Sequence, residues 1–110
     1  MRVLVAALLV ACSAALALSA SVRLEDLPRE ARETLALVQA GAPLPFARDG
    51  AVFANRERQL PAHSRGYYRE YTVKTPGIRG RGPRRIIAGR EGEYYYSDDH
   101  YRTFRRIIVP

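Results

Sequence analysis

The chain has 110 residues, enough for one domain but short for two. It carries 18 lysine and arginine residues against 11 aspartate and glutamate residues, a net charge of +7, which indicates either a polyanionic partner or simply a basic, soluble surface. Its one cysteine, Cys12, excludes an intramolecular disulfide and a multi-cysteine metal site, so the fold must depend on an apolar core and hydrogen bonds.

Residues 1–20 have the features of a secretory signal peptide. Arg2 precedes an apolar run, and both Ala15-Leu16-Ala17 and Leu18-Ser19-Ala20 fit the small-x-small pattern of a cleavage site. We therefore expect residues 21–110 to be an exported, extracellular domain with no membrane segment after cleavage. A lipoprotein box ending at Cys12 is an alternative, but few residues precede it and those that follow stay apolar.

The next segment predicts one amphipathic helix. Asp26 precedes Pro28 and is placed to cap the helix, and proline is tolerated in the first turn because its missing N–H has no partner there. Helical spacing gives one apolar face, formed by Leu27, Ala31, Leu35 and Val38. Gly41 ends the helix.

From residue 67 onward the sequence alternates and is rich in aromatic and β-branched residues, which predicts strands. We expect these over residues 67–73, 84–88, 93–96 and 104–109, with a short edge strand at 51–53. One N-terminal helix followed by strands joined by short turns predicts an α+β fold, a helix packed on a small antiparallel sheet.

Alternation along residues 67–73 places Glu70 on one face of its strand and the more apolar Tyr67, Tyr71 and Val73 on the core face. Glu70 is therefore expected on an open face. Arg85 has the same relation to its own strand, so the two side chains can share a surface that Arg81 also reaches. The alternative is a cross-strand ion pair on a solvated sheet, with no chemistry.

His100 lies in a polar turn, Asp98-Asp99-His100-Tyr101. Neighbouring carboxylates favour a protonated imidazole, although an isolated loop histidine is more often merely exposed. His63 has no assigned role. The sequence contains no metal-binding or nucleotide-binding motif, and we expect neither a metal nor another cofactor.

A glutamate, a histidine and two arginines on one surface would suffice to cleave RNA. The 2′-hydroxyl of RNA is an internal nucleophile, so a base, an acid and cations near the phosphate complete the chemistry. The residue strings themselves resemble a family, the small microbial guanyl-specific ribonucleases of the Streptomyces and barnase type, over residues 27–107. The segments that carry the resemblance are Val52-Phe53-Ala54-Asn55-Arg56-Glu57, Gly66-Tyr67-Tyr68-Arg69-Glu70-Tyr71-Thr72-Val73, Thr75-Pro76-Gly77, Arg79-Gly80-Arg81-Gly82, Arg84-Arg85-Ile86-Ile87 and Asp99-His100-Tyr101.

The resemblance implies a role for each matching residue. Glu70 matches the general base, His100 the general acid, and Arg81 and Arg85 the arginines that stabilise the transition state. The substrate-binding matches are Tyr101 for the phosphate, Glu57 for guanine N1–H and N2–H, backbone amides around Asn55 and Arg56 for guanine O6, and Phe53 beside the base.

The same resemblance implies a monomer that binds single-stranded RNA and, as a further partner, an acidic inhibitor protein of the barstar kind. Cleavage 3′ of guanosine would give a 2′,3′-cyclic phosphate and then a 3′-phosphate. The alternatives are a non-catalytic module that binds RNA or another polyanion, and an antibacterial ribonuclease toxin on the same fold.

Overall fold

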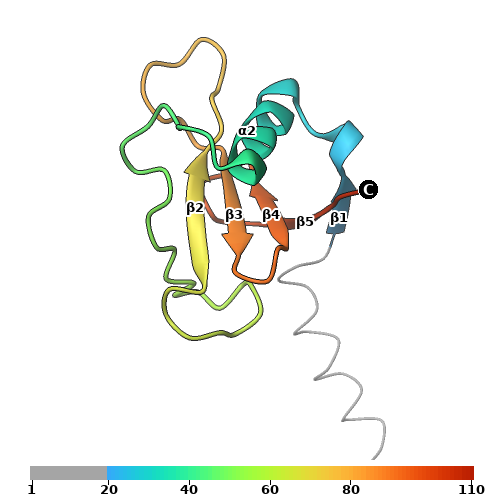
Figure 1. Cartoon of the computed structure of the whole chain (residues 1–110), viewed down its shortest axis with the longest axis vertical. Helices are drawn as coiled ribbons and strands as arrows, with labels where there is room; N and C mark the ends of the chain where they lie inside the picture. The colour runs from blue at the N-terminus through green and yellow to red at the C-terminus, as the bar shows by residue number, and fades with distance from the viewer. Residues whose placement is uncertain (1–19) are drawn as a thin grey trace, which may run out of the picture.

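One α-helix packs on a five-stranded sheet in the computed structural model, which describes residues 20–110 (Figure 1). The strands are β1 (Ala20–Arg23), β2 (Tyr68–Thr72), β3 (Arg85–Gly89), β4 (Tyr94–Ser97) and β5 (Arg105–Ile108). Their order is β1-β5-β4-β3-β2. Neighbours pair antiparallel except β1 and β5, which are parallel. The predicted α+β class and the strands β2–β5 are confirmed; β1 was not predicted, and it makes the sheet mixed.

The helix, α2, runs from Arg29 to Ala40 and ends as predicted. Gly41 has φ 65°, a left-handed conformation that glycine adopts without steric cost, and its N–H donates to the carbonyls of Leu37 and Val38. The predicted cap by Asp26 is wrong. Asp26 lies in a separate 3₁₀ turn, Leu24–Asp26, and its carboxylate accepts from Arg23 Nε at 3.1 Å. Pro28 takes the N-cap position instead.

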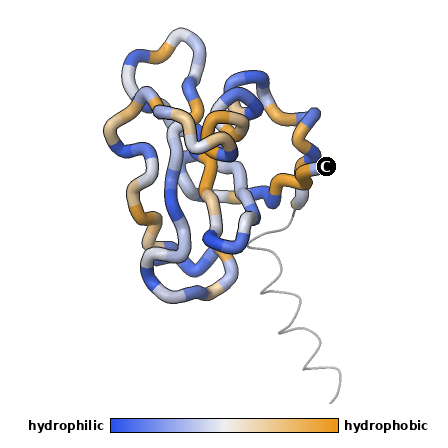
Figure 2. The backbone as a smooth tube through the Cα atoms, viewed as in Figure 1, coloured by the Kyte–Doolittle hydropathy of each residue, from blue (hydrophilic) through white to orange (hydrophobic). Residues whose placement is uncertain are grey.

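Both faces of the sheet are covered by apolar side chains. The helix face contributes Leu27, Ala31 and Leu35 to the first core, as predicted, whereas Val38 is only half-buried. Figure 2 shows the apolar run of β3 lying against α2. The second core covers the opposite face and is rich in aromatic rings; its members are Leu60, Tyr67, Tyr68, Ile87, Tyr95 and Phe104. Tyr67 therefore packs on the face opposite to Tyr71 and Val73, because β2 begins only at Tyr68 and does not extend the predicted alternation to residue 67.

The segment predicted as an edge strand runs beside β2 but forms only one bridge, between Val52 and Arg69. Phe53 N–H donates to the Tyr68 carbonyl and Glu70 N–H to the Ala51 carbonyl, each at 2.9 Å. These bonds cover the open edge of β2, and they place the loop that follows, residues 54–60, beside the strand that carries Glu70.

The signal-peptide prediction concerns residues 1–20, which lie outside the described residues apart from Ala20, the first residue of β1. Within residues 20–110, no helix has the length and apolar character required to cross a membrane.

Candidate active site

The side chain of Glu70 lies on the same face of the sheet as Arg85. In the antiparallel register of β2 and β3, Glu70 is opposite Ile87 and Thr72 is opposite Arg85, so side chains at these alternate positions share a face. The expected proximity is confirmed, because Arg85 Nε lies 3.9 Å from Glu70 Oε1. The expected open face is wrong: Glu70 is only 4% exposed, because the second core and the loops around it cover this side of the sheet.

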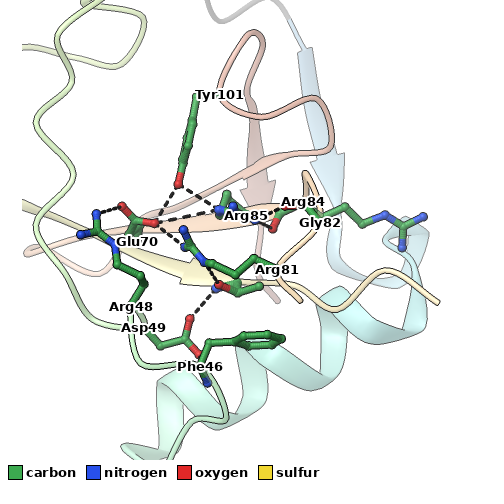
Figure 3. Close-up of polar contacts among 10 residues, drawn as sticks. Phe46, Arg48, Asp49, Glu70, Arg81, Gly82, Arg84, Arg85 and Tyr101 are labelled. Carbon is green, nitrogen blue, oxygen red and sulfur yellow. Dashed lines mark hydrogen bonds and ion pairs between the residues drawn. The ribbon is translucent and has the colours of Figure 1, made fainter. Parts of the chain in front are cut away.

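The two carboxylate oxygens of Glu70 have different partners (Figure 3). Oε1 accepts hydrogen bonds from Arg81 Nη2 at 2.6 Å and from the Tyr101 hydroxyl at 2.7 Å. Oε2 accepts from Arg48 Nη2 at 3.2 Å. Charge-assisted bonds of this kind are short and strong, so the buried carboxylate is well compensated in its ionised form.

These contacts decide the protonation state of Glu70. Burial alone would raise its pKa, but hydrogen bonds from Arg81, Tyr101 and Arg48 outweigh burial and lower the pKa below its ordinary value of 4.5. Glu70 is therefore ionised near neutral pH and can accept a proton, as a general base must.

The two predicted arginines are held in place by neutral acceptors as well as by Glu70. Arg85 is 2% exposed, and its Nη1 donates to the carbonyls of Gly82 and Arg84, each at 2.8 Å. Arg81 Nε donates to Thr72 Oγ1 at 3.0 Å. The turn between them requires glycine at position 82, where φ is 61° and a Cβ would lie 2.8 Å from Thr75 Oγ1. Fixed guanidinium groups of this kind are suited to a phosphate.

His100 and Tyr101 lie in a strained turn between β4 and β5. Both have positive φ, 58° and 70°, and the His100 N–H donates to the Pro83 carbonyl at 2.9 Å. The turn is held by Asp99, whose Oδ1 accepts from Ser97 Oγ and Thr103 N, each at 2.9 Å. The imidazole is exposed, and its ring centroid lies 5.0 Å from that of Tyr101.

The carboxylates beside His100 in the sequence have other partners. Within residues 20–110, no ion pair joins His100 to an aspartate or glutamate, since Asp99 bonds its own turn and Asp98 pairs with Arg105. The contact that does relate His100 to the rest of the site is with Tyr101, whose hydroxyl bonds Glu70.

A cleft of about 530 Å³ extends from Glu70 to the loop expected to bind the base. Phe53, Asn55, Arg56, Glu57 and Tyr101 all line it. Phe53 stacks on Tyr101, with centroids 5.3 Å apart and 27° between the planes. Glu57 is exposed in the structure.

The side chain of Asn55 shapes this loop. It has φ 55°, its Nδ2 donates to the Leu60 carbonyl at 3.0 Å, and its Oδ1 accepts the Leu60 N–H at 3.1 Å. With its side chain bonded to the loop backbone in this way, Asn55 contributes to a preformed loop, and the backbone amides around it remain the candidates for contact with a ligand.

Comparison with known proteins assigns the chain to a family. A family model described as ribonuclease matches residues 10–108. Guanyl-specific ribonuclease St of Saccharopolyspora erythraea is 54% identical over 88 residues, covering 80% of this chain and 87% of that protein. The chain belongs to the microbial guanyl-specific ribonucleases.

Two further relatives are similar to this ribonuclease, one compared by sequence and the other by structure. Guanyl-specific ribonuclease Sa of Kitasatospora aureofaciens is 54% identical over 90 residues, covering 81% of this chain and 94% of that protein. A structure of ribonuclease Sa2 from work on its mononucleotide complexes superposes with a TM-score of 0.80 at 50% identity, covering 81% of this chain and 93% of that one. A second Sa2 structure, with guanosine-2′-cyclophosphate, has a TM-score of 0.78. The similarity to these proteins therefore covers about four fifths of this chain.

The sequence did not predict Arg48 as a residue of this ribonuclease's site. Arg48 lines the cleft and bonds Glu70, although 22 positions separate the two residues. An irregular loop has no regular alternation of side chains, so the sequence around Arg48 does not show which way its side chain points. The only local signal is the following Asp49, a residue typical of turns.

Proposed function

We propose that this ribonuclease cuts single-stranded RNA on the 3′ side of guanosine, with Glu70 as general base and His100 as general acid. The observation that carries the proposal is the state of Glu70, a buried carboxylate kept ionised by hydrogen bonds from Arg81, Tyr101 and Arg48 at one end of an open cleft. The relatives named guanyl-specific ribonucleases support the choice of base.

In the first step Glu70 takes the proton of the guanosine 2′-hydroxyl, and the 2′-oxygen attacks the adjacent phosphorus. The bond from phosphorus to the 5′-oxygen breaks as His100 protonates that oxygen, which leaves a 2′,3′-cyclic phosphate. Arg81 and Arg85 supply positive charge to the phosphorane, and the hydroxyl of Tyr101 contacts the phosphate. These protein cations provide the charge stabilisation, so the proposed reaction uses no metal ion.

In the second step the roles are reversed. His100, now neutral, takes a proton from water, and the hydroxide formed attacks phosphorus. The bond from phosphorus to the 2′-oxygen breaks, and Glu70 returns its proton to that oxygen. The product is a 3′-phosphate, and both side chains regain their starting protonation states.

Guanine is recognised in the cleft beyond Phe53. Glu57 accepts hydrogen bonds from guanine N1–H and N2–H, and backbone amides near Asn55 and Arg56 donate to O6. Because Glu57 is exposed in the free protein, its carboxylate loses water only when a base enters. A base that lacks these donors would leave the carboxylate desolvated and without partners, which is costly.

One assay tests the reaction and its specificity. The domain is incubated with an RNA of defined sequence in EDTA, and the new ends are mapped by mass spectrometry. Cuts after G with cyclic phosphate and then 3′-phosphate ends are expected. Binding of RNA without cutting would support a non-catalytic module, and cuts after every base would refute guanine recognition.

Export of a monomeric domain is a further part of the proposal. Residues 1–20 act as a signal peptide, and the exported protein begins near Leu18 or Ser21. Mass spectrometry of secreted material tests this, because an intact Met1 would contradict it and a lipid on Cys12 would identify a lipoprotein. The expected acidic inhibitor of the barstar kind fits the excess of arginine over acidic residues that the exported domain keeps.

A further inference from the structure

The two oxygens of the Glu70 carboxylate are not equally available. Oε1 is surrounded by Arg81, Tyr101 and, at 3.9 Å, Arg85. Within residues 20–110, the hydrogen bond to Oε2 comes from Arg48 alone, at 3.2 Å. A general base needs a lone pair directed at the proton that it takes. Oε2 is therefore the oxygen that can receive the 2′-hydroxyl proton, provided that Arg48 yields its place.

Arg48 differs from the other arginines of the site in how its side chain is held. The guanidinium of Arg85 is buried and bonded to backbone carbonyls, and that of Arg81 is also bonded to Thr72. The Arg48 side chain is 61% exposed, and its hydrogen bond in the structure is the one to Glu70. Most of the Arg48 side chain remains in water, and its bond to Glu70, at 3.2 Å, is longer than those from Arg81 and Tyr101, so it is the most readily exchanged of the three.

The backbone under Arg48 is fixed, although its side chain is not. The Arg48 carbonyl accepts the Ala51 N–H at 3.0 Å, and the Gly50 N–H donates to the Glu70 carbonyl at 2.8 Å. The neighbouring Asp49 carboxylate accepts the Thr72 N–H at 2.7 Å and the Phe46 N–H at 3.2 Å (Figure 3). The flexible guanidinium is therefore tethered at the wall of the cleft, within reach of Glu70 and of a ligand beside it.

We propose that Arg48 is a displaceable partner of the base: it covers Glu70 Oε2 in the free enzyme, yields that oxygen to the 2′-hydroxyl of a bound guanosine, and moves its own charge onto the scissile phosphate. The proposal rests on the function given above. It makes Arg48 a positioning residue for Glu70 before binding and a phosphate contact after it.

Displacement of Arg48 from Glu70 would make Glu70 a stronger base once the substrate is bound. The Arg48 hydrogen bond is one of the contacts that lower the pKa of Glu70 in the free protein, after those of Arg81 and Tyr101. A carboxylate with a very low pKa is a weak base. When Arg48 moves to the phosphate, one of these contacts is lost, and Glu70 becomes more basic in the complex than in the free enzyme.

Arg48→Gln, with Arg48→Lys as the conservative variant, tests the proposal. Arg90→Gln in the exposed turn between β3 and β4 is the matched control, because it removes the same charge away from the site. Two measurements are made on each: the titration of the Glu70 carboxyl carbon by NMR in the free protein, and the pH dependence of kcat and kcat/KM on the dinucleotide GpC.

In Arg48→Gln we expect the free-protein titration of Glu70, and with it the acid limb of kcat/KM, to move to higher pH. The acid limb of kcat should stay in place, since it reports the complex, in which Arg48 has already left. KM should rise by about 5- to 30-fold for a lost phosphate contact worth roughly 1 to 2 kcal/mol. Arg48→Lys should restore part of each effect, and Arg90→Gln should show none.

Two results would overturn the proposal. An unchanged titration of Glu70 in free Arg48→Gln would mean that Arg48 is not its partner, and equal shifts of the acid limbs of kcat and kcat/KM would mean that Arg48 stays on Glu70 in the complex. Failure of the proposed function would be recognised by a different result, full activity of Glu70→Gln. The NMR titration of Glu70 requires no turnover, so it tests the contact with Arg48 whether or not the proposed function holds.

Discussion

The hydroxyl of Tyr101 donates a hydrogen bond of 2.7 Å to Oε1 of Glu70. The same oxygen of Tyr101 accepts from Arg85 Nε at 2.9 Å. The tyrosine thus connects the base on β2 to the buried arginine on β3, and it belongs to the same turn as His100. The hydroxyl of Tyr101 therefore ties the turn that carries His100 to Glu70 and Arg85.

Removing that hydroxyl should weaken both the fold and the control of Glu70. In Tyr101→Phe the carboxylate loses a bond that lowers its pKa, so the acid limb of the kcat/KM profile should move to higher pH. Arg85 Nε loses its acceptor, and we expect a loss of about 1 to 3 kcal/mol in unfolding free energy at pH 7. Urea denaturation and kinetics on GpC measure the two effects, and an unmoved acid limb would contradict the role given to this bond.

Loss of either proton-transfer group should slow RNA cleavage strongly. We expect Glu70→Gln and His100→Ala each to reduce kcat/KM on GpC by about 10² to 10⁴-fold, the usual contribution of a positioned acid or base. The wild-type profile should be bell-shaped, because activity requires ionised Glu70 and protonated His100. His63→Ala is the control for histidine loss, and full activity of His100→Ala would refute the assignment of the acid.

Base choice should depend on Glu57. We expect the wild-type protein to cut GpC much faster than ApC, because adenine has neither N1–H nor a 2-amino group to satisfy the carboxylate. Glu57→Ala should slow GpC cleavage by roughly 10²-fold, for a charge-assisted pair worth about 3 kcal/mol, and change ApC cleavage far less. The ratio of kcat/KM values for the two dinucleotides is the measurement. Equal slowing of both would make Glu57 a structural residue.

Asp99 should contribute to acid sensitivity through the His100 turn. Burial alone would raise its pKa, but hydrogen bonds from Thr103, Ser97 and Arg102 lower it below 3.8. A carboxyl with a lowered folded-state pKa stabilises the fold at pH above its unfolded value, and that contribution is lost as pH falls through the folded pKa. Asp99→Ala should therefore cost about 1 to 3 kcal/mol at pH 7 and much less at pH 2. Urea denaturation at both pH values tests this; an equal loss at both would show that the charge is unimportant.

Local patterns in the sequence predicted most of the fold, because they depend on near neighbours. The helix and the strands β2–β5 follow from spacing and alternation over a few residues. Strand β1 could not be predicted in this way, since its four residues pair with a strand more than 80 positions away. Asp26 was assigned to the helix because nothing in the sequence shows that a 3₁₀ turn separates it from α2.

The site was predictable where it follows strand geometry and not where loops fold over it. Alternation placed Glu70 and Arg85 on one face, but it could not show that this face is covered, because the covering residues come from distant loops. Arg48 was missed for the same reason. His100 was singled out through the resemblance of its segment to a family, because the residues of the turn alone do not distinguish it from an ordinary exposed loop histidine.

The parallel pairing of β1 with β5 has a consequence for how the protein is made. Val22 in the first strand is opposite Ile107 near the end of the chain, and the two lie in one core. Of the described strands, β1 is the first to be synthesised and β5 the last, so β1 has no partner in the sheet until residues 105–108 have been made. The turn that carries His100 and Tyr101 lies between β4 and β5, and it is closed by the same late pairing. An enzyme that cuts RNA therefore completes both its sheet and this part of its site only with the last strand made.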